Sequence, residues 1–480
     1  MPESFETAIA ANRFGLGARP GELASIGAHG RDWLRAQLLA GPPTLATAQL
    51  RSSTEILGEA LELRREIQGA RKAGVLTNST SDNSTTDDAA AEVAQRVQQR
   101  LPQFLKPIYT AEVTARFAQA VASERPFVER LTQFWANHFA VSVDKQFLAG
   151  LAGSFEREAI RPHVLGDFND MLLAVETHPA MLLYLDNYLS VGPHSAAAQR
   201  AQARQAQRRL GINENLAREI LELHTLGVGG GYTQRDVTTF AEVLTGWSLG
   251  GEGGRLAGGP PGRFVFRPGL HEPGAKVVLG RRYADDGFGQ GAAVLRDLAR
   301  QPATAHFIAG KLARHFIADE PPPAAVARIA DAFAASGGNL PTVYRAMIDA
   351  RESWQQPLAK YKTPLDYVLS SYRGLSLPVD AAHAPLAPFE VLGQRTWQPG
   401  SPAGWPDRSA DWDGASALMK RIQWADAVGS RVGNRADAVQ LAPQLLGANL
   451  SAGTRTAVAH AASATQALTL LLAAPEFMRR

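Results

Sequence analysis

The sequence contains no cysteine, and this absence removes several kinds of chemistry at once. Disulfide bonds, thiolate metal sites and a cysteine nucleophile are all excluded. A surplus of one charge is also missing, because 49 basic residues face 46 acidic residues and no long basic block occurs. Proteins that bind nucleic acid usually carry such a block, so we expect no nucleic-acid partner.

Long apolar runs are absent as well. No segment approaches the roughly 18 apolar residues that a membrane-spanning helix needs, so we expect no membrane span. The opening segment, MPESFETAIAANRFGLG, contains acidic residues and lacks the apolar centre of a signal peptide. These features favour a cytoplasmic protein, or a periplasmic one if the sequence is a shortened form. The localisation therefore stays unknown.

Helical patterning covers most of the 480 residues. Alanine, leucine, arginine, glutamine and glutamate dominate, and apolar residues recur every three or four positions. Thr363 before Pro364, and Thr233 three residues before Asp236, are typical helix starts. Only RFVFRP and AKVVLGRRY are typical of strands. We therefore predict a mainly α-helical fold: one large multi-helical unit over residues 1–480 with a small β-hairpin insertion.

Three segments interrupt the helical pattern. Residues 77–92 are small, polar and acidic, which predicts a disordered insertion loop on the surface. Residues 248–285 begin with a glycine-rich loop and contain both strand-like segments, for which we predict a hairpin across the turn GLHEPG. Residues 393–412 are rich in proline and hold three tryptophans. Tryptophan is costly to expose to water, so we predict an ordered loop there.

The segment NENLAREILELHTLG, residues 213–227, concentrates polar groups on a predicted helix. The simplest interpretation is a solvated face with an Arg218–Glu222 pair, preceded by Asn213 as the helix cap. A functional interpretation turns the same face toward a polar cavity. There Glu219 and Glu222 would act as acid and base or bind a cation, while Arg218 would hold an anion. One helical stripe carries four of these residues: Asn215, Arg218, Glu219 and Glu222.

Further candidates lie outside this helix. Asn137 and His138, in QFWANHFAVS, fit either a helix packed in the core or the wall of a polar cavity. His271 lies in a turn made rigid by glycine and proline, from which it could reach over a pocket. Lys311 and Arg314 lie three residues apart on a predicted helix and fit either a solvated face or a cationic grip on a ligand.

These motifs, in this order, resemble a large bacterial family known as domain of unknown function 1800. The resemblance rests on NRFGLGARPGEL, FWANHFAVS, AMLLYLDN, FRPGLHEPGAKVVLG, YKTPLDYVLSSYRGL and LLLAAPEFMRR, which span almost the whole chain. It implies no reaction, because the family has none established. It does imply that the pattern containing Asn137 and His138 is a family hallmark, and that a protein encoded by a neighbouring gene is a candidate partner.

Two functions remain open at this point. The first is an enzyme of the hydrolase or lyase class that acts on a polar, anionic or glycan substrate in an interhelical cavity. The second is a noncatalytic helical scaffold or partner protein, whose polar motif is a buried network that fixes helix packing. The cofactor is unknown, with a divalent cation as a candidate. The catalytic candidates are Glu219, Glu222, His138 and His271, and the substrate-binding candidates are Asn137, Asn213, Asn215, Arg218, Lys311, Trp397 and Trp405.

Overall fold

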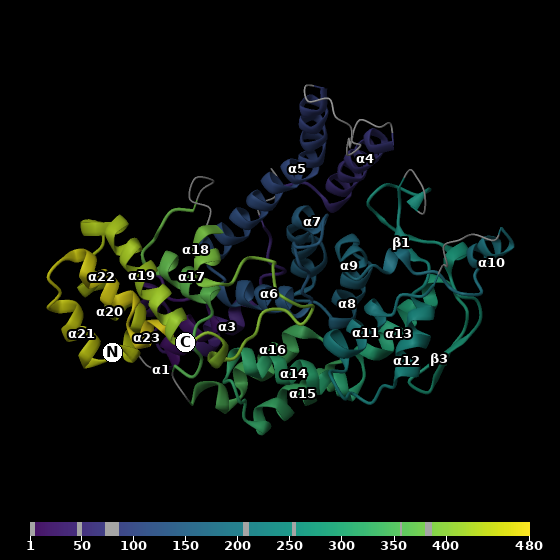
Figure 1. Cartoon of the computed structure of the whole chain (residues 1–480). Coiled ribbons are helices and arrows are strands. Elements are labelled where there is room, and N and C mark those ends of the chain that lie inside the picture. The colour runs from purple at the N-terminus through teal and green to yellow at the C-terminus, as the bar shows by residue number, and fades with distance from the viewer. Residues whose placement is uncertain are drawn as a thin grey trace.

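The computed structural model describes seven stretches of the chain: residues 5–45, 50–72, 86–204, 211–251, 256–355, 358–379 and 386–480. These stretches contain 23 α-helices and two small two-stranded sheets, which confirms the predicted mainly α-helical fold. Within them, no helix is long and apolar enough to cross a membrane. Figure 1 shows two helices, α4 and α5, rising away from the body of the molecule.

Most helices of the first two thirds of the chain pack around the larger of two main hydrophobic cores, and a third, small cluster contains Leu23 and Ile26. Aromatic side chains such as Trp135, Phe316 and Tyr344 are fully buried in the larger core. The helices of this part of the chain are α1 (Phe5–Ile9), α2 (Glu22–Ile26), α3 (Gly30–Gln37), α4 (Ser53–Lys72), α5 (Thr86–Ala122), α6 (Pro126–His138), α7 (Leu148–Phe155), α8 (Phe168–Thr177), α9 (Pro179–Tyr184), α10 (Ala196–Ala203), α11 (Asn215–Glu219), α12 (Gln234–Val243), α13 (Phe288–Ala299), α14 (Pro302–Phe316), α15 (Pro323–Ser336) and α16 (Leu340–Asp349). Helix α2 contributes to the small cluster instead, and α10 has no buried residue.

The remaining helices surround a second core, which also receives Phe117 and Ala120 from the end of α5. Figure 1 shows these C-terminal helices, in yellow and light green, at the end of the molecule opposite the strands. Helix α5 therefore contributes to both cores and joins them. The helices are α17 (Pro364–Gly374), α18 (Leu386–Leu392), α19 (Ala415–Val432), α20 (Ala438–Leu446), α21 (Ala452–Ala459), α22 (Ala464–Leu472) and α23 (Pro475–Met478).

Three α-helices continue without a break into π-helical turns, whose hydrogen bonds run to the fifth residue along rather than the fourth. These are η1 (Ala10–Phe14), η2 (Glu156–Ile160) and η5 (Ile220–Thr225). A π-turn rotates the side chains that follow it away from their α-helical positions. Short 3-10 helices also occur: η3 (Arg161–His163), η4 (Asn187–Leu189), η7 (Pro268–Leu270), η8 (Arg351–Trp354), η10 (Ser409–Asp411), η11 (Gly433–Arg435) and η12 (Gly447–Asn449).

The strands form two hairpins instead of the single one predicted across GLHEPG. Strand β2 (Phe264–Phe266) pairs antiparallel with β1 (Trp247–Leu249), and β3 (Lys276–Val278) pairs with β4 (Arg281–Tyr283). The segment AKVVLGRRY thus folds back on itself. Its two turn residues, Leu279 and Gly280, both have positive φ, the conformation of a tight two-residue hairpin turn. Leucine is rare at such a position, which is why the turn was missed.

Of the other sequence predictions, the two helix starts are confirmed and the length of one loop is wrong. Both predicted helix starts are confirmed, with a capping box at Thr233 and a side-chain cap at Thr363. The predicted loop over residues 77–92 is too long, because α5 begins at Thr86. That part of the sequence holds three consecutive alanines, which favour helix, and residues 77–85 lie outside the described residues. Residues 393–412 are described throughout.

Candidate functional site

A cavity of about 340 Å³ lies where the two hydrophobic cores meet. Helices α6 and α14 of the larger core form one wall, and the start of α17 together with the Trp/Pro segment, residues 393–412, forms the other. Pockets of this size accommodate small-molecule ligands. Five of the predicted site residues line it, namely Asn137, His138, Lys311, Trp397 and Trp405.

Helix α14 presents three polar side chains to the cavity. Lys311, Arg314 and His315 follow the i, i+3, i+4 spacing of one helix face, while Ile308 and Leu312 are buried in the core. Proline at the first position of α14 and apolar residues on its buried side fix the helix so that this face points inward.

Lys311 and Arg314 have no hydrogen bond or ion pair among the residues that the structure describes. The Lys311 ammonium instead lies 5.6 Å from the centre of the Phe307 ring. Burial lowers the pKa of Lys311 to about 8, with Asp407 opposing this fall and Arg314 adding to it. The buried Nε of Arg314 also lacks a partner. The other cavity cations do have carboxylate partners: Arg116 pairs with Glu156, Arg395 with Glu390 and Arg408 with Glu320.

His315 forms an imidazole–carboxylate pair with Asp407 of the Trp/Pro segment. Its Nδ1 lies 3.1 Å from Oδ2 of Asp407, while its buried Nε2 has no partner among the described residues. Burial lowers the pKa of His315, although Asp407 opposes this fall, so the ring is neutral at pH 7. A carboxylate accepts a hydrogen bond only from the protonated nitrogen. Nδ1 therefore carries the proton, and Nε2 is left as a base.

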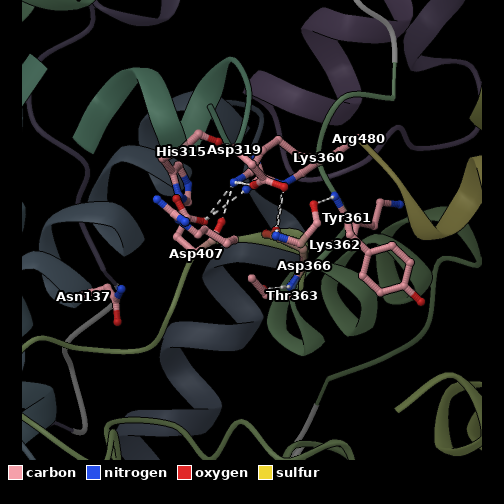
Figure 2. A network of polar contacts seen from close by, with 12 residues as sticks. Asn137, His315, Asp319, Lys360, Tyr361, Lys362, Thr363, Asp366, Asp407 and Arg480 are labelled. Atoms are coloured by element: carbon pink, nitrogen blue, oxygen red, sulfur yellow. Dashed lines mark hydrogen bonds and ion pairs between the residues drawn. The ribbon is translucent and has the colours of Figure 1, made fainter. Parts of the chain in front are cut away.

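Asp407 is held in place from the side opposite His315. Figure 2 shows it among Lys360, Asp319 and Arg480. The ammonium of Lys360 donates to the backbone oxygen of Asp407 and pairs with Asp319, which in turn accepts a hydrogen bond from Ser409 N at 3.0 Å. Burial would raise the pKa of Asp407, but His315, Lys360 and Arg480 hold it well below its usual range. The carboxylate therefore stays ionised and keeps His315 oriented.

Asp366 is a second carboxylate at the cavity, and it is saturated by cations. Arg130 Nη1 lies 2.8 Å from Oδ1, and Arg480 Nε lies 2.9 Å from Oδ2. Burial would raise the pKa of Asp366, but these two guanidinium groups lower it well below its usual range. Because its charge is neutralised by structural partners, Asp366 anchors the start of α17 and leaves the positive charge of Lys311 and Arg314 uncompensated.

His138 connects the cavity to the polar motif of residues 213–227. Its Nε2 lies 3.1 Å from the backbone oxygen of His224, which lies in the π-helical turn η5. His224 is itself buried, and its Nδ1 lies 2.7 Å from Oε1 of Glu176. Burial lowers the pKa of His138 well below its usual value, and Lys311 adds to the fall, so this imidazole is neutral.

The Trp/Pro segment is fastened to α6 by Asn137. The side-chain amide of Asn137 donates to Trp405 O at 2.9 Å and accepts from Trp405 N at 2.8 Å. Gly404 has φ +83°, and a Cβ at this position would lie 2.3 Å from the backbone oxygen of Asn137. On the other side, Val143 N donates to Trp397 O at 2.9 Å. These contacts use both polar atoms of Asn137, so it shapes the cavity wall.

The remaining predicted site residues do not line this cavity. The expected Arg218–Glu222 pair is not formed, because Arg218 pairs with Glu214 at 2.9 Å and also donates to Gln234. The reason is the π-helical turn that begins at Ile220, which rotates Glu222 away from Arg218. Burial raises the pKa of the half-buried Glu219. The hydroxyl of Tyr232 lies 3.4 Å from Glu222.

The other predicted residues have local structural partners. His271 is buried beside the hairpins, where its Nδ1 lies 2.9 Å from Thr245 O. The N-cap of α11 is Glu214, without a side-chain cap, and not Asn213 as expected. Asn213, one residue earlier, accepts a hydrogen bond from Asn215 N at 2.9 Å and donates to Leu185 O. Asn215 is exposed.

Sequence reasoning missed His315 and Asp407. The two residues are 92 positions apart, and neither stands in a motif of known spacing. The available signal was the sequence Lys-Leu-Ala-Arg-His on α14, which puts His315 on the same helix face as Lys311 and Arg314. Among the described residues, no three histidine, aspartate or glutamate side chains lie together as ligands for a metal ion.

Fold and site together define a mainly α-helical protein with a polar cavity between two cores, where two cations have no partner in the part of the chain that the structure describes. The family described as "Protein of unknown function (DUF1800)" matches residues 9–479, and the chain belongs to it. The resemblance inferred from the sequence is thereby confirmed. No curated protein and no solved structure matches the chain.

Proposed function

We propose that the protein is an enzyme of the hydrolase or lyase class that binds a small organic anion in the cavity between α6, α14 and the Trp/Pro segment. One observation carries this proposal: Lys311 and Arg314 line the cavity without a partner among the described residues, next to an imidazole–carboxylate pair. An anionic ligand group would supply the charge that these two side chains lack.

The partners of buried cations elsewhere in the fold support this proposal. Most other buried cations are matched with carboxylates or carbonyls, as in Arg161 with Glu129 and Glu156, or Lys360 with Asp319. Lys362 is an exception, because its ammonium donates to the Ser370 hydroxyl and lies 4.1 Å from the centre of the Phe477 ring. Even Arg421, which stands between two tyrosine rings, donates to Lys362 O. Leaving a poorly solvated cation unpaired lowers stability. Two such cations at one cavity are therefore better explained by binding than by folding.

The same wall offers a base for chemistry. Asp407 fixes the tautomer of His315, so that Nε2 can take a proton from water in a hydrolysis or from the substrate in an elimination. Lys311 and Arg314 would hold the anionic group and stabilise negative charge that develops in the transition state. The roles first assigned to Glu219 and Glu222 pass to His315 in this proposal, since neither glutamate lines the cavity.

A noncatalytic scaffold is the second candidate, and the charged network beside α5 favours it. Arg116, Glu156, Arg161 and Glu129 form a continuous chain of buried ion pairs in which every charge is compensated. Such a network fixes helix packing without any ligand. The two candidates differ in what they require of Lys311 and Arg314, because a scaffold needs neither.

Anion binding separates the two candidates. Isothermal titration calorimetry with phosphate, citrate and glucuronate should detect binding to the wild type, and Lys311→Met or Arg314→Gln should weaken it by at least about tenfold. The exposed Lys420 provides a matched control, and Lys420→Met should bind as the wild type does. If all three anions fail to bind, or if Lys311→Met binds them unchanged, the enzyme proposal loses its support.

A further inference from the structure

The imidazole of His138, which lines the cavity, has one buried nitrogen without a hydrogen-bond partner among the described residues. Its Nε2 lies 3.1 Å from the backbone oxygen of His224, and a carbonyl oxygen can only accept, so Nε2 carries the proton. The remaining nitrogen, Nδ1, is therefore unprotonated. It is buried and has no partner within the described part of the chain. Because His138 lines the cavity, Nδ1 is the one polar atom of this side chain that is free for a ligand.

This acceptor lies in the same neighbourhood as the unpaired cations. The ring of Phe307 is near both groups, with its centre 6.3 Å from the His138 ring and 5.6 Å from the Lys311 ammonium. The ring of Phe134 likewise contacts both His138 and His315, at 6.3 Å and 5.5 Å between ring centres. The cavity therefore combines cationic donors from α14 with bare imidazole nitrogens that accept only.

We propose that the cavity selects anions that carry a hydrogen-bond donor in or beside the charged group, such as hydrogen phosphate or a 2-hydroxycarboxylate, over anions that carry none, such as sulfate. The anionic oxygens would accept from Lys311 and Arg314, and the ligand hydroxyl would donate to Nδ1 of His138. Sulfate would instead place an oxygen lone pair against the lone pair of Nδ1. This inference rests on the proposed function, since it concerns the same anion site.

Phosphate and sulfate form a suitable probe pair, because both are small tetrahedral anions and only phosphate retains a proton near neutral pH. In calorimetric titrations at equal ionic strength, wild type should bind phosphate about tenfold more tightly than sulfate, as expected when a buried acceptor is left unpaired. Glycolate and acetate form a second pair, in which the donor is a hydroxyl next to a carboxylate. Wild type should bind glycolate more tightly than acetate.

His138→Gln isolates the role of the acceptor. The glutamine amide can still donate toward the backbone oxygen of His224, but it places no acceptor where Nδ1 stood. The preference for phosphate should fall to within about twofold, because phosphate loses its acceptor and sulfate no longer faces a lone pair. Lys311→Met should weaken the binding of both anions to a similar extent. If His138→Gln proves poorly folded, the ¹⁵N resonance of Nδ1 in the wild type gives a second measurement, because a new hydrogen bond from phosphate should shift it and sulfate should not.

The possible failures are distinguishable. If wild type binds sulfate and phosphate equally and Lys311→Met weakens both, the donor-selection inference is overturned and the anion site stands. If His138→Gln keeps the full preference for phosphate, His138 is not the selecting residue and the inference is also overturned. If wild type binds neither anion pair, the proposed function itself fails.

Discussion

Replacing Lys311 by methionine should stabilise the unliganded protein at pH 7 even though it removes the proposed anion site. Burial lowers the pKa of Lys311 from its usual 10.5 to about 8. At about 1.4 kcal/mol for each pH unit, holding this lysine protonated in the fold costs up to about 3 kcal/mol. Solvent in the cavity reduces the figure, so we expect a gain of about 1–2 kcal/mol. Methionine is unbranched and flexible enough to fill the same space.

The effect of this substitution should depend on pH in a defined direction. Below about pH 8, Lys311 is protonated in both the folded and the unfolded chain, so wild type bears the whole cost. As the pH rises from there toward 10.5, the folded protein gives up this proton before the unfolded chain does, and the cost fades. The advantage of Lys311→Met should therefore be largest at neutral pH and shrink toward about pH 10.

Urea denaturation followed by circular dichroism, in buffers that contain chloride as the only anion, measures this difference. Lys420→Met, at an exposed lysine, should change the free energy of unfolding by less than about 0.5 kcal/mol at every pH. A clear loss of stability in Lys311→Met at neutral pH would refute the reasoning. It would mean that Lys311 has a stabilising partner in the fold and is not held there for a ligand.

Three further substitutions test the surrounding structure. Glu222→Gln should change the free energy of unfolding by less than about 0.5 kcal/mol in urea denaturation, and a loss above about 2 would reveal a buried ion pair that the contacts do not contain. Gly404→Ala should cost at least about 2 kcal/mol, because φ is +83° and a Cβ would lie 2.3 Å from a backbone oxygen of α6. Gly400→Ala, in open space, is the control, and equal melting temperatures for the two variants would contradict this account. Arg130→Met should cost about 3 kcal/mol because it removes one of the two partners of Asp366, and a loss below about 1 would show that the other suffices.

The fold was largely predictable because its determinants are local. Helical periodicity, the caps at Thr233 and Thr363, and the aromatic content of residues 393–412 each depend on residues close together in the sequence. The pairing of strands was not predictable in the same way. Strand β1 finds its partner β2 across a glycine-rich connection, and the β3–β4 turn uses a leucine at positive φ.

The candidate site was predictable only in part, for a different reason. Asn137, His138 and Lys311 were found because each stands in a segment with an evident helical face. The carboxylates of residues 213–227 were misplaced because the prediction assumed an α-helix throughout, and a π-turn starting at Ile220 changes which side chains share a face. The pair formed by His315 and Asp407 depends on tertiary contact between distant segments, which no spacing in the sequence records.

The polar groups around the cavity divide into two kinds according to whether their charge is compensated. Arg130 comes from a helix of the larger core and Asp366 from a helix of the second core, and their ion pair holds the two cores together at the cavity. The ammonium of Lys360 likewise fastens the segment that carries Asp407, because it donates to the backbone oxygen of that residue. A cavity framed by such saturated pairs keeps its shape without a ligand. Among the described residues, this preformed frame gives Lys311 no carboxylate to pair with, so the charge of its ammonium is available to a ligand.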